Sequence, residues 1–142
     1  MKKIILFSAL SLSILTAFAS AQADSKQIIK NDTDGTMTLS KISYCGGHES
    51  AKDLFPHQIA AHEEKAFSKA VVKEVAHRCI ATYTTTNKQG SKHLLLINYN
   101  PNKNSTCKVI GLKKGNPVTT CTVSKIGKDD YTFTFTEHPK KG

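Results

Sequence analysis

The sequence predicts a mainly β fold: a single antiparallel β-sandwich domain with two disulfides. Short segments rich in β-branched and aromatic residues recur along the chain, and turn-forming residues separate them at nearly regular spacing. Such spacing is typical of antiparallel sandwiches and barrels. In addition, all four cysteines follow a leader-like N-terminus, and an even number of exported cysteines indicates disulfides.

The first 23 residues have the organisation of a secretory signal peptide. Lys2 and Lys3 precede an apolar run over 4–18 that Ser and Thr interrupt, and small residues then offer A-x-A cleavage sites. The apolar run is shorter and richer in serine than a bilayer span requires. We therefore expect residues 1–23 to be a signal peptide. Residues 24–142 should form one secreted or periplasmic domain without a transmembrane segment.

Several segments have the composition of strands. The clearest alternation is in 131–137, where Tyr131, Phe133 and Phe135 share one face and the intervening threonines the other. The apolar run 93–99 predicts a strand buried on both faces, or one in the interior of the sandwich. The remaining predicted strands are 27–31, 36–44, 79–86, 107–112 and 118–126.

The segment 59–77 favours an amphipathic helix over a strand. Phe67, Ala70, Val71 and Val75 recur at helical spacing, with charged residues away from them. The adjacent β-branched pair at 71–72 and the lack of an N-cap keep a strand open as the alternative.

The cysteines are interpreted as structural. If 107–121 is a hairpin centred on Lys114, Cys107 and Cys121 lie directly opposite each other, within the distance that a disulfide spans. Elimination then pairs Cys45 with Cys79. The alternative is a metal site of Cys45, His48, His77 and Cys79, although the spacing of His77 and Cys79 is unusual for zinc.

No catalytic motif is complete. The chain lacks both a C-x-x-C pair and a G-x-S-x-G elbow, and a Cys45–His48 nucleophile would leave an odd exported thiol. We therefore expect no cofactor and no enzymatic activity. The alternative is a small periplasmic or secreted enzyme, or a metal-binding protein, that uses the Cys45, His48, His77 and Cys79 cluster.

The chain has a net charge of +9, with 20 Lys and Arg residues against 11 Asp and Glu. Nearly all the cations are lysines. The chain lacks the arginine cluster with interleaved aromatics that indicates nucleic-acid binding, so we expect no nucleic-acid partner. Two interpretations of this charge are open: a solvated surface that keeps the protein in solution, or a surface that is attracted to acidic lipid or glycan. The candidate contacts are Lys103, Lys108, Lys113, Lys114, Lys125 and Lys128.

A likeness to known proteins extends over most of the mature chain. The segments QIIKNDTDGTMTLS, FPHQIAAHEEKAF, ATYTTT and INYNPNKNSTCKV follow one another in an order that resembles small secreted β-sandwich proteins of the aegerolysin and crystal-toxin type. The chain departs from them in lacking Trp, in being basic and in carrying four cysteines. The resemblance implies a sandwich whose loops meet lipid or a partner, and it implies a strand instead of a helix in 59–77.

Together these features predict a secreted bacterial binding protein or effector that contacts an anionic surface. A second possibility is an inhibitor or adhesin that contacts a protein partner through the long segment 46–58.

Overall fold

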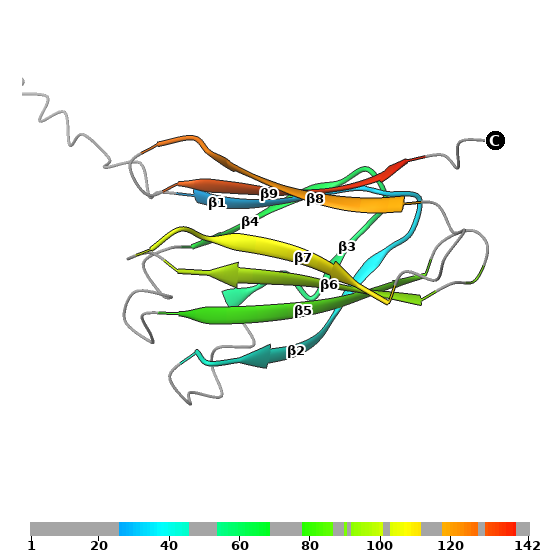
Figure 1. The fold of residues 1–142 in the computed structure, drawn as a ribbon, viewed down its shortest axis with the longest axis horizontal. Helices are drawn as coiled ribbons and strands as arrows, with labels where there is room; N and C mark the ends of the chain where they lie inside the picture. The colour runs from blue at the N-terminus through cyan, green and yellow to red at the C-terminus, as the bar shows by residue number, and fades with distance from the viewer. Residues whose placement is uncertain are drawn as a thin grey trace, which may run out of the picture.

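The computed structural model describes residues 26–45, 54–68, 78–86, 90, 92–100, 103–111, 118–127 and 130–138. The predicted signal peptide, 1–23, lies outside these residues. The described part is mainly β and contains two sheets (Figure 1). Its strands are β1 (Lys26–Asp32), β2 (Met37–Ser43), β3 (Gln58–Ile59), β4 (Glu64–Ser68), β5 (Cys79–Thr86), β6 (Lys92–Tyr99), β7 (Thr106–Ile110), β8 (Val118–Lys125) and β9 (Tyr131–His138).

The four-stranded sheet has the order β4-β1-β9-β8 and contains one parallel pair. β1 and β9 run parallel, with Ile29 beside Phe133 and Asn31 beside Phe135. The prediction of a wholly antiparallel fold is therefore wrong at this pair. A parallel pair needs a long connection between its strands, and here the rest of the domain supplies it. The first and last strands are thereby held side by side.

The five-stranded sheet has the order β3-β2-β5-β6-β7, and all its pairs are antiparallel. β5 and β6 pair along their whole length, from Cys79 opposite Tyr99 to Thr86 opposite Lys92. The register between β2 and β5 shifts between Leu39 and Lys41, which leaves Ser40 as an extra residue on β2.

Aromatic side chains from both sheets meet in one core. The ring of Phe67 on β4 lies 5.6 Å from that of Tyr99 on β6, and the Tyr99 ring lies 6.5 Å from that of Tyr131 on β9. Tyr131, Phe133 and Phe135 are all buried, as the alternation in 131–137 predicted. Edge-on contacts of this kind add to the free energy gained from burying the rings.

The strand 92–99 is buried on one face only. His93, Leu95, Ile97 and Tyr99 are buried, but Leu94 is 40% exposed and Leu96 is only half-buried. Of the two expectations for this segment, burial on both faces is wrong, because no described element covers the outer face of β6; its inner face is buried. Two leucines therefore lie on an uncovered sheet surface.

The predicted helix over 59–77 is wrong where the structure describes it. Ile59 belongs to β3, and residues 64–68 form β4, which pairs antiparallel with β1. Phe67 places its ring 4.6 Å from that of Phe55, in the core. Backbone pairing with β1 and burial of Phe67 outweigh the local helical spacing. Residues 69–77 lie outside the described part.

The chain passes between the sheets at the β1–β2 and β3–β4 connections, and Asn31 contacts both. Its Nδ2 lies 2.8 Å from the carbonyl oxygen of Gly35, 3.1 Å from that of Ile59 and 2.9 Å from that of Ala60. Its Oδ1 accepts a hydrogen bond from Thr33 Oγ1 at 2.7 Å. Asn31 is fully buried, and its single side-chain amide makes all of these hydrogen bonds. Their contribution to the stability of the fold therefore depends on this one group.

We expect Asn31→Ala to lower the free energy of unfolding by about 3 kcal/mol, because it leaves buried carbonyl oxygens without donors. Chemical denaturation of the disulfide-bonded protein measures this loss. Asn104→Ala, at an exposed position, is the matched control and should change stability little. Equal effects of the two substitutions would contradict the role given to Asn31.

A second prediction concerns Tyr83, which is fully buried and whose hydroxyl donates to the Pro56 carbonyl oxygen at 2.9 Å. Burial raises the pKa of Tyr83, since the phenolate would lose its hydration. The folded pKa exceeds that of the unfolded chain, so stability is full below pH ~10 and falls as pH rises above it. In unfolding measurements across this range, Tyr83→Phe should remove part of that fall, at a cost of about 1 kcal/mol at neutral pH.

Candidate functional site

The four cysteines form two disulfides, with the predicted pairing. Cys45 joins Cys79 with a Cα–Cα distance of 4.5 Å, and Cys107 joins Cys121 at 5.9 Å. The predicted hairpin between the second pair is wrong, because β7 pairs with β6 and β8 pairs with β9. The Cys107–Cys121 bridge instead links the end strands of the two sheets. A Cα separation of this size fits a cross-strand pair and a bridge between sheets equally well.

The alternative metal site loses its sulfur ligands in this form of the protein. Cys45 and Cys79 are bonded to each other, so neither supplies the thiolate that zinc requires. His48 and His77 lie outside the described residues. Within the described ranges, no three His, Cys, Asp or Glu side chains are grouped so as to hold a metal ion.

The long segment 46–58 is anchored at its described end. Leu54 and Phe55 are buried, and the Pro56 carbonyl accepts the hydrogen bond from Tyr83. Residues 46–53 lie outside the described part. Residues 54–58 thus pack as part of the domain and lead into β3.

The predicted lysine contacts are divided between the sheets. Lys108 is exposed on β7, and Lys103 is exposed just before that strand. Lys125 ends β8 in the other sheet, with its Nζ 6.0 Å from the centre of the buried Tyr131 ring. Lys113, Lys114 and Lys128 lie outside the described residues. The structure therefore places Lys103 and Lys108 by one sheet and Lys125 in the other.

The outward surface of β2, β5, β6 and β7 is named here the open face. The inward positions of these strands carry the buried Tyr83, Leu95 and Ile97, so the alternate positions point away from the core. In register across the sheet, these outward positions are Lys41 beside Thr82, Thr82 beside Leu96, and Leu96 beside Lys108. A neighbouring row contains Thr38, Thr84, Leu94 and Ile110.

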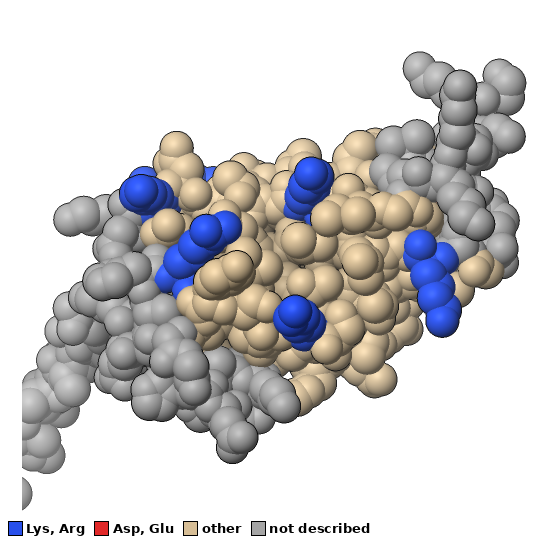
Figure 2. Space-filling view, turned by 60° about the horizontal axis from the view of Figure 1, so that its bottom comes forward, with Lys and Arg blue, Asp and Glu red and all other residues tan. Residues whose placement is uncertain are grey.

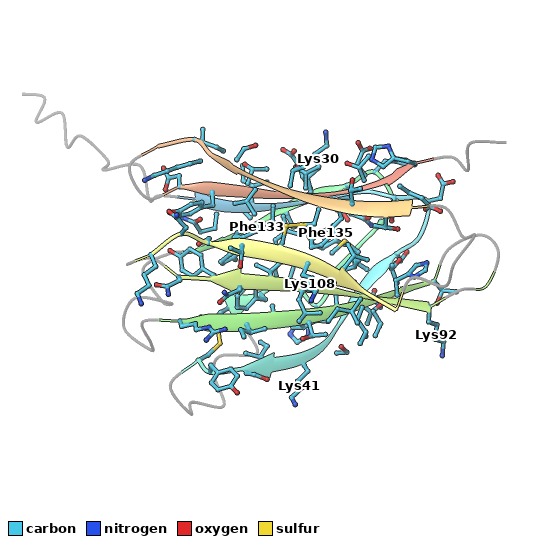
Figure 3. The ribbon with its side chains drawn as sticks, in the orientation of Figure 1. Lys30, Lys41, Lys92, Lys108, Phe133 and Phe135 are labelled. Carbon is cyan, nitrogen blue, oxygen red and sulfur yellow. A yellow bond between two sulfur atoms is a disulfide. The ribbon has the colours of Figure 1, made fainter. Side chains whose placement is uncertain are left out.

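The open face belongs to a sheet whose strands contain no acidic residue. Its strands contribute Lys41, Lys92 and Lys108, all exposed, and Arg78 lies just before β5. Figure 2, which brings the lower side of Figure 1 forward, shows Lys and Arg spread over this surface and no Asp or Glu among the described residues. Lys41 and Lys30 project to opposite sides of the domain in Figure 3.

The acidic residues of the described chain lie instead in the four-stranded sheet and its connections. They include a cluster in which His62 Nε2 lies 3.2 Å from Asp34 Oδ1 and His62 Nδ1 lies 3.4 Å from Asp32 Oδ1. The full set is Asp32, Asp34, Glu63, Glu64, Asp130 and Glu137. Within the described residues, no carboxylate forms an ion pair with Lys41, Lys92 or Lys108. The charge of the open face is therefore not neutralised by the described residues.

A shallow hollow lies beside the open face where β2 bulges. Leu39, Ser40, Lys41, Ile42 and His57 line it, and Ser40 Oγ donates to the Thr82 carbonyl at 2.9 Å. The bulge separates Leu39, which pairs with Tyr83, from Lys41, which pairs with Thr82. Lys41 is thereby aligned with the outward positions of β5.

The sequence-based selection took lysines on strand edges and turns between residues 103 and 128, and so missed Lys41 and Lys92, which lie on β2 and at the start of β6. One signal was available: the sequences of 36–44, 79–86, 93–99 and 107–112 contain Lys41 and Lys108 and no acidic residue, and Lys92 directly precedes the third of them. Assigning those four segments to one sheet, however, needed the strand pairing.

No helix within the described residues is long and apolar enough to cross a membrane. No protein-family model matches the chain, and no curated protein matches its sequence.

We expect the two disulfides to differ in accessibility to reductant. Cys45 and Cys79 are buried, whereas Cys107 and Cys121 are half-buried at the meeting edges of the sheets. Under limiting dithiothreitol, alkylation followed by peptide mass mapping should label Cys107 and Cys121 first. Loss of that bridge should cost about 3 kcal/mol. Earlier labelling of Cys45 and Cys79 would contradict this order.

Proposed function

We propose that the protein is an exported single-domain β-sandwich that binds an anionic surface, of lipid or glycan, through the open face. It acts by binding and not by catalysis. The two disulfides are compatible with an oxidising compartment, where such a protein would work. The observation that carries the proposal is the confinement of the described acidic residues to the four-stranded sheet and its connections, which leaves the lysines of the open face without described carboxylates.

The physical argument rests on unneutralised cations spread over one surface. Lys41, Lys92 and Lys108 are exposed on strands of an acid-free sheet, so their potentials add, and no carboxylate of the described residues pairs with them. A lysine close to an acidic lipid surface contributes about 1 kcal/mol to binding. Three such lysines together supply about 3 kcal/mol, or roughly a hundredfold in affinity.

The metal-dependent or enzymatic alternative has less support. It needs Cys45 and Cys79 as thiolates, and the structure joins them in a disulfide. A protein partner with an acidic surface satisfies the same charge argument and would bind the same face.

The test compares two triple variants that remove equal charge from opposite sheets. Lys41→Gln, Lys92→Gln and Lys108→Gln remove the open-face cations. Lys30→Gln, Lys65→Gln and Lys125→Gln are the matched control from the four-stranded sheet. Adsorption to acidic phospholipid vesicles and to dextran sulfate is measured between about 0.05 M and about 0.5 M salt, since this range screens surface charge.

The wild type and the control variant should adsorb at low salt and dissociate steeply as salt rises. The open-face variant should bind roughly a hundredfold more weakly. Equal weakening by both variants would show that net charge alone acts and that the open face is not the site. Adsorption of the wild type to neither probe would reject the proposed function.

A further inference from the structure

We infer that the open face docks on the interface of an anionic lipid bilayer, with Leu94 and Ile110 entering the boundary between head groups and acyl chains. This inference rests on the proposed function and names its ligand. The docking surface is the face of a sheet, at the start of β6 and the end of β7.

The first observation is an exposed aliphatic pair. Leu94 and Ile110 lie directly opposite each other on β6 and β7, and each is 40% exposed. Leu96, half-buried, lies two residues along β6 on the same face. A sheet face that meets only water usually carries polar side chains at such positions. These side chains would bury further apolar area on contact with acyl chains.

The second observation is the placement of cations around this pair. Lys92 precedes Leu94 by two residues and Lys108 precedes Ile110 by two, so each aliphatic side chain has a lysine on the same face of its strand. Figure 3 labels both lysines on the five-stranded sheet. Lysine stems reach along apolar surface while their ammonium groups stay at the level of phosphates. Apolar groups between cations complement an anionic bilayer interface.

The side chains favour lipid over the other anionic ligands. Sugar rings commonly stack on aromatic side chains, but Tyr83 and Tyr99 of β5 and β6 point into the core. Tyr44 is 73% exposed, but its ring is already in contact with a cation, because its centre lies 5.5 Å from the guanidinium carbon of Arg78. A second copy of the chain would bring like charges on Lys92 and Lys108 together, which opposes pairing of two open faces.

The chain contains no tryptophan, so one substitution provides a specific optical probe. Leu94→Trp carries the probe on the open face. Thr122→Trp, at an exposed position of β8 in the other sheet, is the matched control. Each disulfide-bonded variant is mixed with vesicles of neutral phosphatidylcholine, with vesicles containing phosphatidylglycerol, and with dextran sulfate. Unchanged denaturation midpoints verify that both variants fold.

We expect the emission of the Leu94→Trp variant to shift to the blue on phosphatidylglycerol vesicles and to be quenched by lipid brominated on its acyl chains. The Thr122→Trp variant should bind equally well without either change. In a separate pair of substitutions, Leu94→Asn with Ile110→Asn should weaken vesicle binding roughly tenfold, since the apolar contacts are lost. Adsorption to dextran sulfate should not weaken.

The outcomes separate this inference from the proposed function. Adsorption to vesicles without a blue shift or quenching overturns the bilayer contact and leaves anionic-surface binding intact. Binding to dextran sulfate but not to vesicles also overturns the bilayer contact, and it assigns the face to a glycan. Lack of adsorption to any anionic probe overturns both, and leaves an acidic protein as the remaining partner for this face.

Discussion

The buried amide of Asn31 is the interaction on which the arrangement of the two sheets depends. It contacts carbonyl groups from both connections that carry the chain between the sheets, at Gly35 and at Ile59 and Ala60. Those carbonyls would otherwise lose water without gaining a donor. Gly35 is required beside this amide, because a side chain there would collide with the carbonyl oxygen of Thr86. The β1–β2 connection is thus packed closely against the end of β5.

Once the sheets are held in this way, strand alternation determines what the open face carries. Tyr83, Leu95 and Ile97 enter the core, so their neighbours along β5 and β6 must point outward. The Cys107–Cys121 bridge ties the end strands β7 and β8, and so keeps the edge of the open face in place. The surface proposed for binding is therefore a consequence of the same packing that forms the core.

The side chains of the open face lower the stability of the free protein, and a bound ligand would remove this effect. Lys41, Lys92 and Lys108 repel one another in the free protein, since no described carboxylate pairs with them, and Leu94 and Ile110 expose apolar area to water. A ligand that is both anionic and apolar reduces the repulsion between the lysines and the apolar area exposed to water at the same time. Because it would bind only the folded protein, it would also stabilise the fold.

Local features followed from the sequence alone: the alternation in 131–137, the strands around 79–86 and 93–99, and the joining of the four cysteines in disulfides. These follow from the two-residue period of a strand and from the chemistry of exported thiols. Which strands are neighbours is set by the tertiary structure. It placed 107–110 and 118–125 in different sheets, set β1 parallel to β9, and made 64–68 a strand, because backbone pairing with β1 and burial of Phe67 outweigh local spacing. The open face could not be predicted for the same reason, since its lysines and leucines come from strands that only non-local hydrogen bonds bring together.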